Sequence, residues 1–159
     1  MKKTILLLAF LFIYGCNDTP YLKENSAFIV FKTPTFRYAD MGFIYHSPQR
    51  TKLQIYASGQ SVMSLKITQE SVCMSALECM SKESFNKQVL SEAYPKDILE
   101  DILNAKPIFA KKDIKYTQQG FTQELKEQNS YDIKYKVSKN KIEFKDKINH
   151  INIKIIKDI

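Results

Sequence analysis

From residue 27 onward, apolar and polar side chains alternate with the period of two that is typical of half-buried β-strands. Leu53, Ile55 and Ala57 share one face of the segment 52–57, and the Ser58–Gly59 pair after it predicts a hairpin turn. The same kind of pattern predicts strands at 27–31, 36–46, 62–68, 71–77, 114–118, 121–126, 131–138, 142–145 and 150–157. Because the links between these segments are short, the pattern indicates an antiparallel meander.

Helical spacing interrupts the strands in the middle of the chain. Phe85, Val89 and Ala93 recur at four-residue intervals, and Pro95 stands where a second helix would begin. Asn104 and Pro107 are the expected end of that second helix. The sequence therefore predicts an α+β fold, in which a strongly curved antiparallel sheet, a half-open barrel, is covered by two or three helices.

The first sixteen residues, MKKTILLLAFLFIYGC, have the organisation of a bacterial export signal. Lys2 and Lys3 are followed by about ten apolar residues, too few for a membrane-spanning helix, which needs about 20. The run ends in Ile13-Tyr14-Gly15-Cys16, which resembles a lipobox, the site where a signal peptidase cleaves before a lipid-modified cysteine. We expect Cys16 to carry the lipid that anchors the protein to a membrane. The alternative is an ordinary secreted protein in which Cys16 has no such role.

This interpretation divides the chain into three parts. Residues 1–15 are expected to be a lipoprotein signal peptide, 16–25 a lipidated tether, and 26–159 a single domain. Asn17 follows the cysteine, where Asp would favour retention in the inner membrane of enteric bacteria. The expected location is thus the periplasmic face of the outer membrane, with the inner membrane and the cell surface as alternatives.

Composition narrows the class of protein further. The formal net charge is +7, or +5 (22 − 17) without Lys2 and Lys3, a surplus that favours anionic surfaces but is too diffuse to identify one. The lysines of the last third predict either a solvated sheet face or a face that contacts anionic headgroups. Lipidation and export make a nucleic-acid partner unexpected, and we expect a monomer.

Motifs for catalysis or metal binding are missing from the sequence. It contains no nucleophile-elbow, zinc-protease, phosphate-loop or dinucleotide-binding pattern. His46 and His150 have no partner at ligand spacing, and Glu100 and Asp101 are interpreted as helix-end electrostatics. We therefore expect a protein that is not an enzyme and that holds no metal and no cofactor.

Cys73 and Cys79 are the other cysteines, and an oxidising compartment permits a disulfide between them. Along one extended strand they would lie roughly 20 Å apart, too far for a bond. They can be joined if 74–78 turns back as a hairpin loop. A disulfide and two unpaired thiols remain alternatives.

Four passages, taken in order, resemble the LolA/LolB lipoprotein-carrier family, and LolB in particular. They are the lipobox, the hairpin 48–67 (PQRTKLQIYASGQSVMSLKI), the helix 95–107 (PKDILEDILNAKP) and the strands of 115–154, which include YDIKYKV at 131–137. Two features depart from LolB. The hairpin turn, 57–61, lacks the large apolar residue used to deliver lipoproteins, and the chain has no Trp.

The resemblance implies a receptor that takes acyl chains or lipoproteins into an apolar cavity, with lipoproteins and a periplasmic carrier as partners. A cavity of this kind needs apolar side chains on a concave sheet face and on the helices above it. The candidates are Phe43, Tyr45, Leu53, Ile55, Met63, Leu65, Ile67, Val89, Leu90, Leu99, Ile102 and Leu103. The same residues could instead pack together as a closed core. In that case the chain would be a non-catalytic envelope-assembly or surface-exposed lipoprotein that acts as a protein-interaction module.

Overall fold

The structure is a computed structural model, and it describes residues 20–74 and 78–157. In this part of the chain, eleven antiparallel strands form one sheet in the order β6-β5-β4-β3-β2-β1-β11-β10-β9-β8-β7. The N-terminal half of the sheet consists of β1 (Lys23–Lys32), β2 (Arg37–Ser47), β3 (Arg50–Ala57), β4 (Gln60–Ile67), β5 (Ser71–Cys73) and β6 (Cys79–Ser81). The C-terminal half consists of β7 (Ile114–Thr117), β8 (Gly120–Glu127), β9 (Tyr131–Ser138), β10 (Lys141–Asp146) and β11 (Ile151–Lys157).

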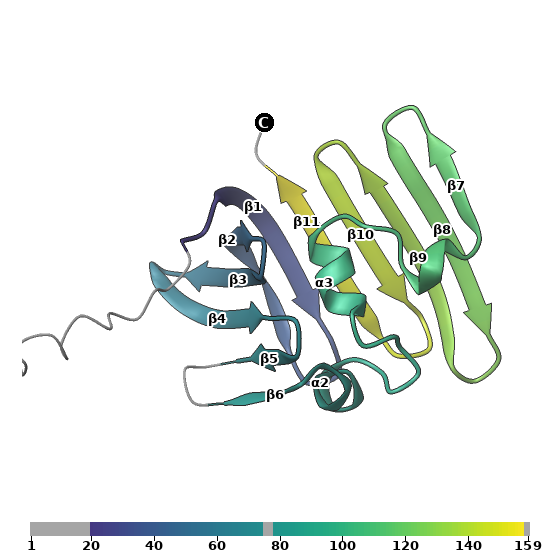
Figure 1. Ribbon diagram of the computed structural model, residues 1–159, viewed down its shortest axis with the longest axis horizontal. Coiled ribbons are helices and arrows are strands. Elements are labelled where there is room, and N and C mark those ends of the chain that lie inside the picture. Colours follow the sequence, from purple (N-terminus) through teal and green to yellow (C-terminus); the bar gives the residue numbers. More distant parts are fainter. Residues whose placement is uncertain (1–19, 75–77, 158–159) are drawn as a thin grey trace, which may run out of the picture.

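Each half is a meander of sequential neighbours, and the first and last strands join the two. In that central pair Ala27 lies opposite Lys157 and Phe31 opposite Ile153. The sheet is open, with β6 and β7 at its edges (Figure 1). Between the halves runs a linking segment, residues 82–113, with α2 (Lys82–Val89), α3 (Ile98–Leu103) and the one-turn 3₁₀ helix η2 (Phe109–Lys111).

The predicted fold class is wrong in its helical part. The described residues contain two α-helices, of eight and six residues, which lie on one face near the middle of the sheet (Figure 1). Helices of that length are only about 9–12 Å long, whereas eleven strands spaced about 4.8 Å apart make a sheet about 48 Å wide. The protein is therefore mainly an open antiparallel sheet and not a half-open barrel covered by two or three helices.

Local backbone geometry explains why the helices are short. Leu90 ends α2 with φ −114° and ψ −101°, outside the helical region. After α3, Ala105 takes a positive φ of 55°, and Pro107 follows two residues later. Much of what covers the sheet is consequently irregular chain.

The core lies between the inner face of the sheet, which we define as the face toward the linking segment, and that segment. Thirty apolar side chains are buried in one cluster, drawn from both halves of the sheet and from the linking segment. Gly42 is required on β2, because a Cβ there would stand 2.2 Å from the backbone oxygen of Gln54. In the same strand pair, Ile44 and Leu53 lie opposite one another on the inner face.

Candidate functional site

The predicted lipid anchor lies outside the described residues, together with the whole signal peptide 1–15 and residues 16–19 of the tether. The tether was expected to extend to residue 25, but β1 already begins at Lys23. Among the helices of the part that the structure describes, none is both long enough and apolar enough to span a bilayer.

Ten of the twelve predicted cavity residues are buried on the inner side of the molecule. Leu65, for example, is only 1% exposed and lies opposite Leu53. The strands contribute Leu53, Ile55, Met63, Leu65 and Ile67, and the linking segment contributes Val89, Leu90, Leu99, Ile102 and Leu103. All ten belong to the one buried cluster, so in this structure they contact each other as a core.

Phe43 and Tyr45 do not belong with the other ten. They alternate along β2 with the buried Ile44, so their side chains lie on the opposite, outer face of the sheet. The register confirms this placement, because Phe43 pairs with Gln54 while Ile44 pairs with Leu53. Their assignment to a concave inner surface is corrected on this ground.

A groove of about 410 Å³ opens beside β4 and includes two of the predicted cavity residues, Met63 and Leu65. Phe36, Val62 and Met74 contribute to the same groove. A second cavity, of about 790 Å³, lies where the start of β1 meets the turns at 118–119 and 139–140. Its side chains are mostly amides, hydroxyls and charged groups, which suit a polar ligand better than an acyl chain.

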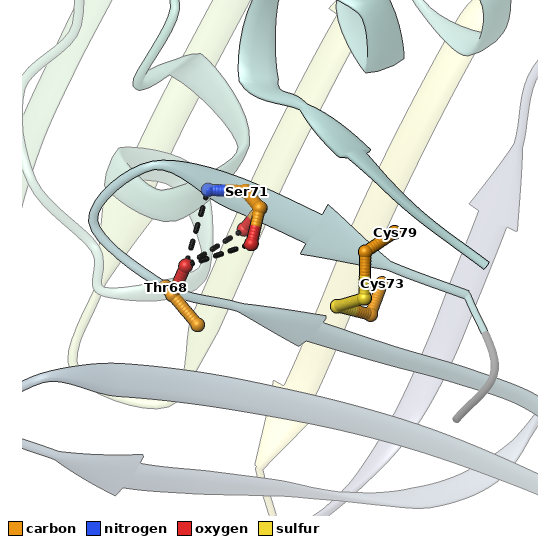
Figure 2. Close-up of a disulfide and its surroundings, with 4 residues drawn as sticks. All are labelled: Thr68, Ser71, Cys73 and Cys79. Carbon is orange, nitrogen blue, oxygen red and sulfur yellow. Dashed lines mark hydrogen bonds between the residues drawn. A yellow bond between two sulfur atoms is a disulfide. The ribbon is translucent and has the colours of Figure 1, made fainter. Parts of the chain in front are cut away.

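Cys73 and Cys79 form a disulfide, and the two residues are directly paired between β5 and β6 (Figure 2). The chain reverses between them, and Met74 N–H donates to the Glu78 carbonyl at 3.0 Å. At the preceding turn, the Thr68 hydroxyl accepts from Ser71 N–H at 3.1 Å and lies 2.9 Å from the Ser71 hydroxyl (Figure 2). These contacts secure the β5–β6 hairpin at one edge of the sheet.

A buried lysine joins the two helices. Lys82 Nζ donates to Asp97 at 2.8 Å and to Glu100 at 2.6 Å. Burial alone would lower the pKa of Lys82, but the two carboxylates reverse this, and the pKa is raised above its ordinary value. Both carboxylates are therefore held as ion-pair partners, an arrangement that stabilises the linking segment and offers no free acid or base.

Asp101 has a different environment from its neighbours. Its half-buried position raises its pKa to about 6, against the opposing effect of Lys106 and with a smaller contribution from Asp97 and Glu100. A shift of this kind is a feature of some catalytic acids. The groove and the polar cavity described above do not include Asp101 among their lining residues.

Two buried polar residues in the C-terminal half were not anticipated. Gln123, fully buried, donates to the carbonyls of Ile108 and Lys112 and accepts from Ile108 N–H. Asp146 accepts from the hydroxyl of Tyr94 and from the side chain of Asn149. The sequence could have indicated their burial, because each lies two residues from a buried apolar residue on its strand and therefore on the same, inward face.

Burial by itself would raise the pKa of Asp146. Hydrogen bonds from Tyr94, Asn149 and the backbone of Asp132 outweigh burial and hold the pKa below its ordinary value. Asp146 thus remains ionised and fixes both the linking segment and the β10–β11 turn to the sheet. Its role is structural.

A group of partly and fully exposed aromatic and apolar side chains lies on the outer side of the N-terminal half. We define the aromatic face as Tyr21, Phe28, Met41, Phe43, Tyr45 and Tyr56. Ring centroids are 5.5 Å apart for Tyr21 and Tyr45, and 5.8 Å for Phe43 and Tyr56. Phe28 and Met41 are paired across β1 and β2 and are 39% and 44% exposed.

Cationic side chains accompany these rings. The Arg50 guanidinium lies 4.5 Å from the ring centroid of Tyr21, and Lys52 Nζ lies 5.5 Å from that of Tyr45. Burial, followed by the charge of Glu24, raises the pKa of Tyr45, so the phenol stays neutral. The aromatic face combines apolar area, hydroxyl groups and positive charge, which is the composition of a binding surface.

No protein-family model matches the chain, and a search of the curated proteins returned no significant match.

Proposed function

We propose that this chain is a lipid-anchored lipoprotein of the bacterial envelope whose sheet domain is a protein-interaction module without catalytic activity. The observation that supports an interaction module is the separation of side chains between the two faces of the N-terminal half. Apolar residues such as Leu53 and Leu65 are buried together inside, while aromatic and cationic residues lie partly exposed on the outside. Because the inner side chains form a closed core, the domain can bind a partner through its outer surfaces and not through an internal cavity.

The buried charged side chains have structural partners, so a catalytic role is not needed to explain their positions. The carboxylates of Asp97 and Glu100 are paired with Lys82, and Asp146 holds a turn. In the described residues, no cluster of three or more His, Cys, Asp or Glu is arranged to hold a metal ion. A binding function is consistent with each of these placements.

The second candidate is a LolB-like receptor for acyl chains or lipoproteins at the periplasmic face of the outer membrane. The groove at Met63 and Leu65 favours it, because the polarisable side chains of Met63 and Met74 suit a variable apolar ligand. This candidate requires the acyl chain to lie in the groove or to displace part of the closed core. Its partners would be lipoproteins and a periplasmic carrier.

Two measurements test these proposals. Radiolabelled palmitate should enter the natural chain and should not enter Cys16→Ala, because that substitution removes the thiol that is modified. Label in the mutant would contradict the lipid anchor.

Mass spectrometry of the purified protein distinguishes the two binding functions. The interaction module predicts that no acyl ligand co-purifies other than the anchor itself. The receptor predicts a co-purified acyl chain that is lost in Val62→Glu, because a carboxylate at this exposed position of the groove would have to be desolvated against the chain. The matched control is Gln60→Glu, an exposed position of the same strand that does not line the groove.

A further inference from the structure

The chain enters the structure at the aromatic face. Tyr21 packs on Tyr45 and lies under Arg50. Leu22, the next residue, is 73% exposed, although it is a large apolar side chain. At the start of the described residues, Tyr21 therefore contacts this face.

The tether sets how far this face can be from Cys16. Four residues, 17–20, separate Cys16 from Tyr21. A fully extended chain advances about 3.5 Å per residue, so the two residues can be no more than about 18 Å apart. If Cys16 is lipidated, as in the function proposed above, Tyr21 is confined to a thin layer next to the bilayer.

The charge of the outer face suits an anionic surface. Alternation along β1–β4 places one carboxylate, Glu24, and five cationic residues on this side: Lys32, Arg37, Arg50, Lys52 and Lys66. Lys52 and Lys66 lie directly opposite one another on β3 and β4. Like charges in that position repel, and an anionic group bound over them would relieve the repulsion.

The aromatic residues suit the headgroup layer of a bilayer. Tyrosine is enriched there because its ring is apolar and its hydroxyl stays hydrated. Phe28 and Met41 add exposed apolar area between the rings and β11. A protein partner could use the same surface, but the short tether and the position of Leu22 favour a lipid one.

We propose that the outer face of β1–β4 rests on the membrane that holds Cys16, with the aromatic face at headgroup level and its cationic residues on anionic phospholipids. The lipid anchor and this face together fix the orientation of the domain. The linking segment, on the other side of the sheet, then points away from the membrane and is accessible to protein partners (Figure 1).

The absence of tryptophan from the sequence allows a direct test. A single Trp is introduced as Phe43→Trp on the aromatic face, or as Lys87→Trp on α2, where the lysine side chain is 71% exposed. The mature chain is mixed with phosphatidylethanolamine–phosphatidylglycerol vesicles whose acyl chains are brominated and quench nearby Trp. We expect the Phe43→Trp signal to fall about twofold, because an interfacial side chain reaches the acyl boundary. The Lys87→Trp signal should not change.

Separate variants test how much the lysine charges contribute to membrane binding. Lys52→Gln and Lys66→Gln should each weaken binding to these vesicles about fivefold at low salt. The same variants should not change binding to phosphatidylcholine vesicles. Lys87→Gln, which removes a cation from the opposite side, is the control.

Failure of this inference can be told apart from failure of the anchor. Equal quenching at positions 43 and 87 overturns the membrane orientation, whether or not palmitate labels Cys16. Preferential quenching at position 43 in a chain that takes up no palmitate supports the orientation and contradicts the anchor. A photo-crosslinker at position 43 that captures a protein in intact cells, and not lipid, would also overturn the proposal.

Discussion

The two halves of the sheet have similar inner faces and different outer faces. Inside, both halves present buried aliphatic and aromatic side chains to the linking segment. Outside, the N-terminal half carries the aromatic face, whereas β8–β11 carry lysines interspersed with carboxylates. In the C-terminal half Lys134 lies 3.1 Å from Glu124, and Lys141 lies 2.9 Å from Glu143. The comparison shows that the alternation of apolar and polar residues along the strands decides which side chains are buried. The residues on the outer face decide what each half can bind.

The linking segment is also attached differently to the two halves. On the C-terminal half it is held by buried polar contacts, through Asp146 to Tyr94, Gln123 to Ile108, and the Tyr135 hydroxyl to the Lys106 carbonyl at 3.1 Å. On the N-terminal half a corresponding contact is the one between Asn104 and Thr51, at 3.2 Å. Buried polar contacts favour a single position of the linking segment on the sheet, because any other position would leave buried polar groups unpaired and would raise the free energy of the folded state.

The largest effect is expected from charge on either inner face. Leu65→Glu in β4 and Ile153→Glu in β11 should both unfold the domain, because each puts a carboxylate at a fully buried position of a marginally stable protein. Leu65→Ala and Ile153→Ala should each cost about 3 kcal/mol. Thermal melting followed by circular dichroism measures all four. A folded Leu65→Glu would mean that water reaches the inner face of the N-terminal half, contrary to the equivalence of the two inner faces.

A smaller loss is expected from removing the polar attachment of the C-terminal half. Asp146→Ala should lower the free energy of unfolding by about 4 kcal/mol, because it leaves several buried donors without an acceptor. Denaturant titration checks this, with Asp132→Ala as a control that removes only surface ion pairs. Since the pKa of Asp146 is depressed in the folded state, its contribution is present above about pH 4 and is lost as the pH falls through the folded pKa. Similar losses for the two variants would argue against this attachment.

Asp101 should give a pH dependence of opposite sign. Its folded pKa of about 6 exceeds the value of about 3.9 in the unfolded chain, so the folded state binds the proton more readily. Stability should therefore fall as the pH rises from about 4 to about 6, and Asp101→Asn should flatten that slope. At pH 7 the variant should be more stable by about 1 kcal/mol, after allowance for the partial exposure of the group. Denaturant titrations at several pH values would reveal an unchanged slope, which would contradict this assignment.

The smallest effect is expected on the outer face of the C-terminal half. Lys134→Ala removes an ion pair whose two side chains are both 68% exposed, so it should leave the denaturation midpoint unchanged. Denaturant titration in low and high salt is the measurement. A clear fall of the midpoint would show that this face is organised more tightly than its exposure indicates.

The strands could be predicted because period-two burial is a local property of the sequence. The strand expected at 131–138 has those bounds, and Tyr131, Ile133, Tyr135 and Val137 are its buried residues. From the sequence alone the disulfide is one of two alternatives, because it depends on a reversal of the chain between Cys73 and Cys79. The structure supplies that reversal as the β5–β6 hairpin.

In segments with apolar residues on both faces, the sequence alone does not show which face is buried. Phe43, Ile44 and Tyr45 are consecutive, so their sequence does not say which of them points inward. Pairing with β3 decides it, by placing Ile44 against Leu53. Gln123 and Asp146 were overlooked for the opposite reason, because a polar residue in a strand suggests exposure even when its position in the alternation is inward. Helix length was overestimated because apolar spacing continues past Leu90, where the backbone leaves the helix.

The pairing of β1 with β11 bears on how the protein folds. These strands are the first and last of the sheet, so the contact that unites the two meanders closes the longest loop in the domain. Sheets that depend on such distant pairings form slowly. Until β11 arrives, β1 is an unsatisfied edge that can pair with another chain. A newly synthesised molecule is therefore most prone to aggregation just before its last strand is in place, and a chaperone that shields β1 would act at that moment.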